Sequence, residues 1–234
     1  MRFFARSLAE IGTDIREFVN DWLIEASVRG HLEIVRYLVA QGADARAYDD
    51  KCVRCVSAYG HLAVVRYAVE ECGADVRACD DEAVRMASAG GHEAVVRYLV
   101  GRGANTRALD NDATRLASAN GHLAVVRYLV ERDAANVRAN VGGCLQNASA
   151  GGHLAVVRYL VKECGANVRA LDNDAVLLAS AGGHLAVVRF LFEHGADARA
   201  HDDEAVRRAS AVGRRPLGGR ALPRRPRRRC PRLR

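Results

Sequence analysis

The chain has 234 residues, of which 50% are hydrophobic and only 6% are aromatic. This composition supplies enough apolar material for a sizeable core. The sequence contains no run of about 18 apolar residues, so a membrane-spanning helix is not expected. Residues 214–234 contain ten Arg and no acid, which leaves 25 basic against 28 acidic residues, or about −3, for the body of the chain. The basic character therefore belongs to one short tail, and a basic fold is excluded.

Targeting and redox signals are weak. Glu10 and Asp14 follow the apolar N-terminal residues too soon for a secretory signal. The seven Cys are an odd number at mostly unrelated places, which favours free thiols in a reducing compartment. We therefore expect a cytoplasmic or nuclear protein that is neither secreted nor bound to a membrane.

A Gly-His pair recurs along the chain and defines an internal repeat. The His residues are His31, His61, His92, His122, His153 and His184, each 30 or 31 residues after the one before. Starting each unit at the Gly of Gly-Ala-Asp-Val-Arg or its equivalent gives units 12–41, 42–72, 73–102, 103–133, 134–164 and 165–194. A half unit, 1–11, precedes them, and a partial unit, 195–213, follows.

The first half of each unit predicts a helix, which in the third unit covers residues 81–89. Asp80 or Asp81 supplies a carboxylate of the kind that caps a helix N-terminus. The predicted inward stripe is Val84, Ala87 and Ser88. Gly90 and Gly91 end the helix, because Gly tolerates the left-handed backbone of a helix C-terminus.

A second helix is predicted over residues 93–101 and is ended by Gly103. The predicted inward residues are Val95, Val96, Leu99 and Val100, while Arg97 faces water. Two helices in about 30 residues cannot bury their apolar faces alone. Successive units must therefore stack into an all-α solenoid with a continuous core.

The phrase Gly-His-x-x-Val-Val-x-Tyr-Leu-Val-x-x-Gly-Ala-Asp-Val resembles the ankyrin repeat, and the resemblance extends from residue 1 to about 213. Two features depart from that family. Its Thr-Pro-Leu-His box is replaced by sequences such as that of 82–85, and the unit is about three residues shorter before the first helix. We therefore expect an ankyrin solenoid with shortened finger loops. Short units with few Pro also resemble ankyrin arrays encoded by giant DNA viruses.

The repeated residues argue against catalysis, a cofactor, a metal or a small-molecule site. Equivalent His residues lie about one helix spacing apart, too far to share a zinc ion, so each His is expected to bond to a loop at the turn between helices. Cys52 and Cys55 form a C-x-x-C pair without a second pair, and Cys55 falls in a core or near-core column. The repeated Ser column is scaffold, since a nucleophile would be one special Ser. Nothing supports an enzyme.

The ankyrin resemblance implies protein binding through the finger loops and the exposed side of the first helix. The residue twelve after each unit start varies there and reads Ile24, Arg54, Arg85, Arg115, Gln146, Leu177 and Arg207. Acidic residues gather at the fingers. The candidate protein-binding residues are Asp49, Arg54, Asp80, Asp81, Arg85, Asp110, Arg115, Gln146, Asp172, Leu177, Asp202 and Arg207. The partner would be a protein whose identity the sequence does not give.

Nucleic acid is the alternative partner. Two regular Arg columns run along the array, but acidic columns oppose them, and a solvated, salt-bridged face is the favoured interpretation. The Arg-rich tail, 214–234, is expected to be disordered and could bind nucleic acid nonspecifically or act in the nucleus. It also permits a different origin: with synonymous codon choice, a one-base shift rereads it as a second helix and the start of another unit. Our hypothesis is that the tail is a frameshifted repeat, which fits better than a functional arm, and the DNA sequence decides between them.

The fifth unit breaks the pattern at its finger. It reads Asn140-Val141-Gly142-Gly143-Cys144 with no acid. The sequence leaves open whether this is a local weak point or a contact site.

Overall fold

The computed structural model describes the backbone of residues 14–197 and the side chains of residues 18–133, 140–170 and 173–197. Within this range the chain forms twelve α-helices and no strand. The predicted half unit 1–11, the tail 214–234, and the candidates Asp202 and Arg207 lie outside the described residues, as does the side chain of Asp172. Across residues 14–197, no helix combines the length and apolar composition needed to cross a bilayer.

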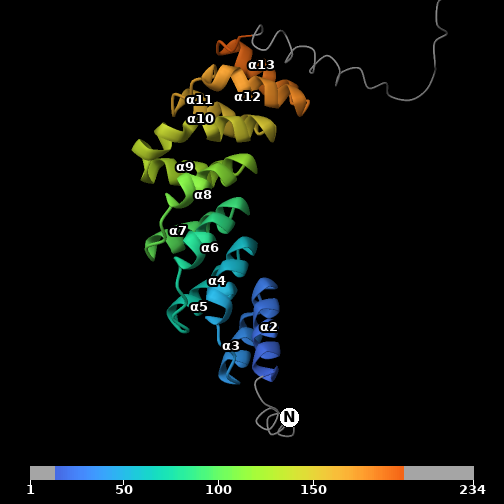
Figure 1. The fold of residues 1–234 in the computed structure, drawn as a ribbon, viewed down its shortest axis with the longest axis vertical. Coiled ribbons are helices and arrows are strands. Elements are labelled where there is room, and N and C mark those ends of the chain that lie inside the picture. The colour runs from blue at the N-terminus through green and yellow to red at the C-terminus, as the bar shows by residue number, and fades with distance from the viewer. Residues whose placement is uncertain (1–13, 198–234) are drawn as a thin grey trace, which may run out of the picture.

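The helices follow one another in six antiparallel pairs that stack from one end of the molecule to the other (Figure 1). The pairs are α2 Asp14–Val28 with α3 Leu32–Ala40, α4 Ala47–Tyr59 with α5 Leu62–Glu70, α6 Ala78–Ala89 with α7 Glu93–Gly101, α8 Ala108–Ala119 with α9 Leu123–Arg132, α10 Ala134–Ala150 with α11 Leu154–Lys162, and α12 Ala170–Ala181 with α13 Leu185–Glu193. We number them first to sixth.

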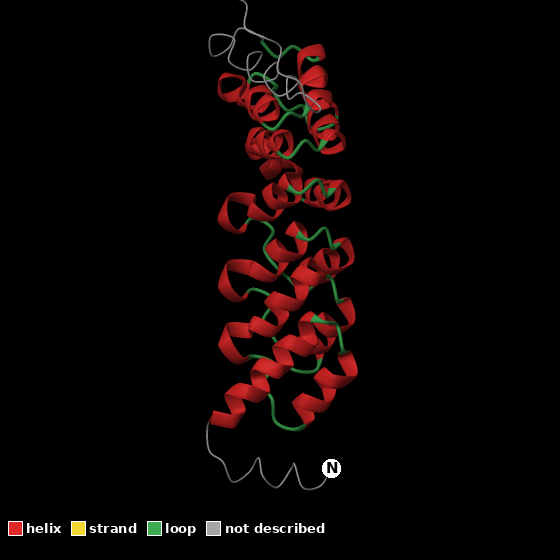
Figure 2. Ribbon diagram, turned by 90° about the vertical axis from the view of Figure 1, so that its right-hand side faces the viewer, coloured by secondary structure: helices red, strands yellow, loops and turns green. Residues whose placement is uncertain are grey.

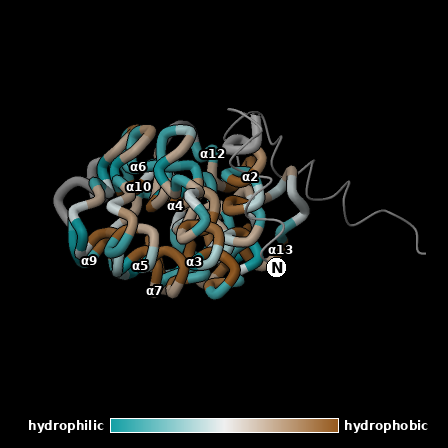
Figure 3. The backbone as a smooth tube through the Cα atoms, turned by 90° about the horizontal axis from the view of Figure 1, so that it is seen from below, coloured by the Kyte–Doolittle hydropathy of each residue, from teal (hydrophilic) through white to brown (hydrophobic). Residues whose placement is uncertain are grey.

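Each pair contributes one helix to each of two layers (Figure 2). The even-numbered helices contact one another in succession along one layer, and the odd-numbered helices do so along the other. A view along the long axis places the two sets on opposite sides, with hydrophobic backbone positions between them (Figure 3). The predicted all-α solenoid is confirmed.

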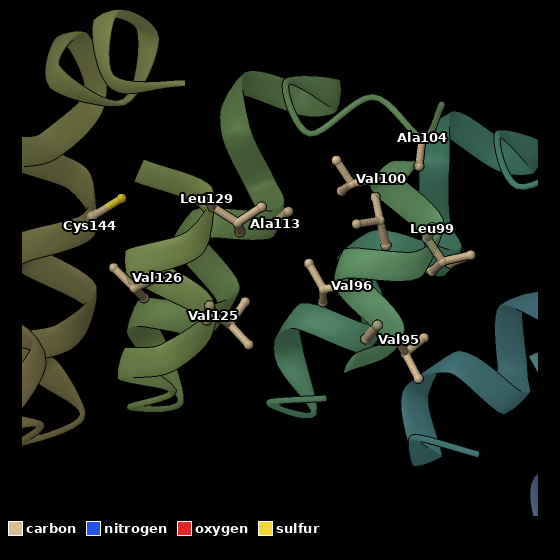
Figure 4. Packing of buried hydrophobic residues seen from close by; sticks show 14 of the residues in the cluster. Val95, Val96, Leu99, Val100, Ala104, Ala113, Val125, Val126, Leu129 and Cys144 are labelled. Atoms are coloured by element: carbon tan, nitrogen blue, oxygen red, sulfur yellow. The ribbon is translucent and has the colours of Figure 1, made fainter. Parts of the chain in front are cut away.

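The core runs between the two layers. Val84, Ala87 and Ser88 of α6 are fully buried, and Val95, Val96 and Leu99 of α7 are no more than 1% exposed. Figure 4 shows the α7 and α9 valines and leucines pointing into the space between successive helices. The predicted inward stripes are correct, and each stripe packs against the next pair as well as against its own partner helix.

Three of the first helices, α4, α6 and α8, begin with a left-handed turn of three residues. Residues 48–50, 79–81 and 109–111 all have positive φ, between 49° and 63°. Non-Gly residues adopt this conformation at an energetic cost, and Asp and Asn tolerate it best. Asp or Asn fills the second and third positions of all three turns. These compact turns are the shortened finger loops.

The predicted helix cap is wrong. No side-chain hydrogen bond caps α6. Because the turn at 79–81 is left-handed, the carboxylate of Asp81 faces the next pair, where its Oδ1 accepts a hydrogen bond from the backbone N–H of Asn105 at 2.6 Å. The acid therefore links two pairs instead of ending one helix.

The helix terminations agree with the sequence. Gly91 has φ 75° and Gly103 has φ 95°, so both adopt the left-handed conformation that was predicted. A side chain at Gly91 would also overlap the imidazole of His122 from the next pair. The small residue is therefore required twice, by the backbone and by the neighbouring ring.

The fifth pair differs from its neighbours. Its first helix, α10, runs unbroken over 17 residues, and none of residues 140–143 has positive φ. Val141 stands where the regular turns have Asp49, Asp80 and Asp110. A β-branched side chain is strongly disfavoured at positive φ, so the segment continues as helix instead of forming the turn.

Candidate interaction surface

Three side chains on the first helices each reach a carboxylate on the following first helix. Arg54 Nε lies 2.5 Å from Glu82 Oε2, and Arg85 Nε lies 2.9 Å from Asp112 Oδ2. Gln146 Nε2 donates to Asp174 Oδ2 at 3.2 Å. We call these contacts the ladder. They join the second pair to the third, the third to the fourth, and the fifth to the sixth.

The ladder changes how the predicted binding column is interpreted. The side chains of Arg54 and Arg85 are only 20% and 16% exposed, because each lies between two helices. Arg54 Nη1 also donates to the carbonyl oxygens of Tyr48 and Asp49, at 3.1 and 2.9 Å, and so holds its own left-handed turn. Arg54 and Arg85 therefore act mainly as structural links between helices, and only a small part of each side chain is exposed to solvent.

Two members of the column carry apolar side chains. Ile24 and Leu177 are half-buried and pack against the hydrophobic core. Over its described members, from Ile24 to Leu177, the column is therefore polar in its centre and apolar at both ends.

A second set of links, which we call the clamps, uses the last residue of the turn. Asp50 Oδ1 accepts the N–H of Asp75 at 3.1 Å, as Asp81 accepts that of Asn105. Asn residues do the same elsewhere. Asn20 Oδ1 accepts the N–H of Asp44 at 2.8 Å, and Asn173 Oδ1 accepts that of Asp197 at 3.0 Å.

Burial affects the charged clamps. Asp50 and Asp81 are 8% and 7% exposed. Burial raises the pKa of Asp50, an effect that the Asp75 N–H and the nearby Arg46 guanidinium oppose. Asn makes the same bond without burying a charge, which explains why both residue types serve at this position.

The predicted acidic column therefore divides into two groups. Asp50 and Asp81 are buried in clamps, whereas Asp49, Asp80 and Asp110 are exposed on the left-handed turns. The exposed group forms an acidic row along the edge of the first-helix layer. These three carboxylates, unlike Asp81, are accessible to a partner.

Arg115 breaks the ladder. The position of the ladder acceptor, 28 residues after Arg115, is occupied by Gly143, which has no side chain. Arg115 instead pairs with Asp112, one turn earlier on its own helix, and its side chain is 50% exposed. Asp112 also holds Arg85, so one nearly buried carboxylate serves two guanidinium groups.

A cavity of about 180 Å³ lies at this break. Its lining residues are Asp110, Arg115, Asn140, Gly143 and Cys144. Asn140 Nδ2 donates to the carbonyl oxygen of Asp110 at 3.2 Å and so spans the fourth and fifth pairs. Figure 4 shows the side chain of Cys144 on α10 directed back toward the fourth pair.

The repeated His residues join the pairs. The Nε2 atoms of His61, His92, His122, His153 and His184 lie 2.8–2.9 Å from the carbonyl oxygens of Val28, Ala58, Ala89, Ala119 and Ala150. A carbonyl only accepts, so Nε2 donates in each case. The predicted bonding at the turn between helices is confirmed for these five His residues, although each acceptor lies in the last turn of the preceding pair's first helix and not in a loop. Among the described residues no three His, Cys, Asp or Glu are arranged to hold a metal ion.

Cys52 and three of the repeated Ser hydroxyls have structural contacts. Cys52 is 1% exposed, lies 3.1 Å from Ser27 Oγ, and has its pKa raised by burial to about 11. Cys55 is half-buried, as predicted. Ser27, Ser57 and Ser88 donate to the carbonyl four residues earlier, at 2.6–2.7 Å. A protonated buried thiol and hydroxyls held by helix carbonyls are poor nucleophiles.

Sequence reasoning missed one set of contacts. The second-helix arginines are exposed, yet in the first five pairs the arginine lies over an aromatic ring of the next pair. The Arg36 guanidinium lies 5.2 Å from the Tyr67 ring centre, and that of Arg97 lies 4.3 Å from Tyr128. The signal was available in the repeated Arg-Tyr dipeptide. Arginines engaged in this way contribute to the stack and do not form an unopposed phosphate track.

Comparison with known proteins identifies the repeat. The family model for ankyrin repeats in three copies matches residues 52–141 and 116–202, and the model for a single ankyrin repeat matches residues 23–50. The chain belongs to the ankyrin repeat family. Comparison with curated proteins gave no match. Among solved structures, the crystal structure of the human ASB11 ankyrin repeat domain superposes with a TM-score of 0.66 at 21% identity, covering 80% of this chain and 96% of that one.

The ankyrin array keeps the family's stacked helix pairs and uses left-handed turns at the finger position. Ankyrin repeats are in general protein-interaction modules. The candidate surface is accordingly the edge that carries the left-handed turns and the outer side of the first helices. On it, Asp49, Asp80, Asp110 and Arg115 are the sequence-predicted residues with exposed side chains.

Proposed function

We propose that the chain is a non-enzymatic scaffold that binds a partner protein through its left-handed turns and first-helix surface. The observation that carries this proposal is the division of the acidic column. Buried acids hold the array together, while Asp49, Asp80 and Asp110 are left exposed in a row at a regular interval. A rigid row of like charges on a stacked frame suits a partner with complementary basic groups.

Several charged residues elsewhere contribute to the fold. Arg54 and Arg85 hold neighbouring carboxylates, and second-helix arginines stack on aromatic rings. The exposed turn acids, by contrast, lie together on one edge, which suits recognition by a partner. The six described cysteines form no disulfide with one another, which fits a compartment that keeps thiols reduced, so we place the scaffold in the cytoplasm or nucleus.

The similarity to short-unit arrays of giant DNA viruses is part of this proposal. Its support is the 30- or 31-residue spacing of the Gly-His pairs. If it holds, the partner is a protein of the infected cell, and capture should succeed from host extract.

Affinity capture from cell extract with quantitative mass spectrometry tests the scaffold function. The variant carries Asp49→Asn, Asp80→Asn and Asp110→Asn, because Asn tolerates the left-handed backbone and removes only the charge. The matched control carries Glu131→Gln, Glu163→Gln and Glu193→Gln, three exposed acids that lie away from the turns. Recovery of the partner should fall at least tenfold for the Asn variant and stay unchanged for the control. Equal recovery from both variants would contradict the proposal.

A further inference from the structure

The ladder contacts recur at an interval of 27 or 28 residues, and one arginine of the column, Arg115, lacks a carboxylate at that interval. Each donor lies 27 or 28 residues before its acceptor, as in Arg54 with Glu82 and Arg85 with Asp112. The same interval from Arg115 ends at Gly143. Arg54 and Arg85 therefore each face a carboxylate on the next first helix, whereas Arg115 faces a glycine.

The space for that carboxylate is present. A Cβ added to Gly143 would meet no described atom within 4 Å. The cavity of about 180 Å³ opens at this point, with Arg115 on one wall and Cys144 on another. A cavity of this size has room for several waters, and therefore for the end of a side chain.

Arg115 is available to a visiting group. Its side chain is 50% exposed, against 16% for Arg85. Its bond to Asp112 is shared with Arg85, so Arg115 competes for a carboxylate that is already engaged. A second carboxylate would give Arg115 the partner that the regular pairs supply internally, and guanidinium–carboxylate pairs are strong and directional.

The charges around the cavity set its preference. Asp112 is nearly buried and neutralised by two guanidinium groups. Asp110 is exposed on the rim, where solvent and salt screen its repulsion and where it can accept a backbone N–H from a bound segment. A carboxylate inserted against Arg115 therefore meets one cation directly and one exposed, screened anion on the rim of the cavity.

We propose that this cavity, which we call the Gly143 notch, is a subsite for an acidic side chain of the bound partner protein. The partner's Asp or Glu takes the place of the missing ladder acid and pairs with Arg115. The inference rests on the proposed scaffold function and adds to it the chemical class of one anchoring residue. The fifth pair thereby differs from its neighbours in specificity as well as in shape.

The test uses the full chain and displayed random dodecapeptides as the probe. Peptides selected on the wild-type array should share an Asp or Glu, and the strongest binder is then synthesised with that residue and with its amide counterpart. Isothermal titration calorimetry should show at least a tenfold loss of affinity on the Glu→Gln or Asp→Asn change in the peptide. Gly143→Asp in the array should cause a similar loss, because it fills the notch and engages Arg115.

Gly101→Asp is the matched control. Like Gly143, Gly101 is a helical glycine whose added Cβ meets no described atom within 4 Å, and it lies on the exposed surface of α7. The control should bind the peptide within twofold of wild type. Thermal melting of Gly143→Asp at or above the wild-type temperature excludes misfolding as the cause.

Two outcomes would contradict the proposal that the Gly143 notch binds an acidic side chain. One is that selection returns no binder with a shared acidic residue, and the other is that Gly143→Asp binds as well as wild type. If the Asp49, Asp80 and Asp110 charges still control partner capture in either case, the scaffold function stands and only the subsite is lost. If neither the exposed turn acids nor Gly143 affects any binding, both proposals fail.

Discussion

The third and fifth pairs perform the same stacking with different links. The third pair joins its neighbours through a clamp at Asp81, ladder contacts at Glu82 and Arg85, and the His92 ring. In the fifth pair Gly142 stands at the clamp position and Gly143 at the ladder position. The His153 bond and the Gln146 contact remain.

The difference shows which links are essential and which are replaceable. The fifth pair stays in the stack through shared apolar packing, the His153 bond, and the Gln146 and Asn140 contacts, without a clamp or ladder acid of its own. The clamp and ladder contacts at the turn add to this packing. Where they are missing, as at Gly142 and Gly143, the surface beside Arg115 is open to a partner. The same two glycines that weaken the fifth pair also create the notch beside Arg115.

The largest change in the free energy of unfolding is expected at Gly91, because the His122 hydrogen bond between pairs needs a glycine there. Gly91→Ala places a Cβ at φ 75° and against the His122 ring, which is then displaced from the Ala89 carbonyl. We expect a loss of about 3 kcal/mol, combining left-handed strain with the loss of a partly buried hydrogen bond. Urea unfolding of the full chain measures it.

Gly73→Ala is the control for this prediction. Gly73 has a similar φ of 71°, but an added Cβ there meets no described atom within 4 Å. It should cost about 1–2 kcal/mol from strain alone. Equal losses for the two variants would show that the His ring does not join the pairs.

A smaller effect of opposite sign is expected in the fifth pair. Gly143→Asp supplies the missing ladder acid and replaces a helical glycine, so stability should rise by about 1 kcal/mol. Most of the electrostatic gain should vanish in an Arg115→Ala background, which a double-mutant cycle by urea unfolding would show. A gain that is independent of Arg115 would mean that only helix propensity improved.

The smallest effect concerns the charged clamp. Burial raises the pKa of Asp50 in the folded chain, so the folded state binds more protons than the unfolded state as pH rises from the unfolded pKa to the folded one. Stability therefore falls across that acidic interval, and the penalty is complete above it. Asp50→Asn should gain roughly 0.5 kcal/mol at pH 7 and flatten this dependence.

Thermal melts from pH 3 to pH 7 check the Asp50 prediction. The natural Asn at positions 20 and 173 makes the same bond, so the substitution preserves the clamp. A destabilised Asp50→Asn variant would mean that the clamp needs a negative charge.

The repeat made much of the fold predictable from the sequence. The regular Gly-His pairs fix where each helix ends, and the second helix predicted at 93–101 coincides with α7. The inward stripes followed from helical periodicity, because packing in one pair is repeated in every other.

The contacts between pairs were less accessible to sequence reasoning. An Asp before a helix normally reads as a cap, and only the positive φ of residues 79–81 turns Asp81 toward Asn105. Arg54 and Arg85 looked exposed because their partners lie 27 or 28 residues away in the sequence. The break at Gly142 and Gly143 was visible, but its meaning required the position of Arg115.

Native-state hydrogen exchange, resolved by mass spectrometry, tests most directly whether links between neighbouring pairs set local stability. The account predicts that backbone amides of α10, where the clamp and ladder residues are glycines, exchange faster than those of α6 and α8. Gly143→Asp should slow exchange in α10 and leave α6 unchanged. Protection in wild-type α10 equal to or greater than that in α6 and α8 would contradict it.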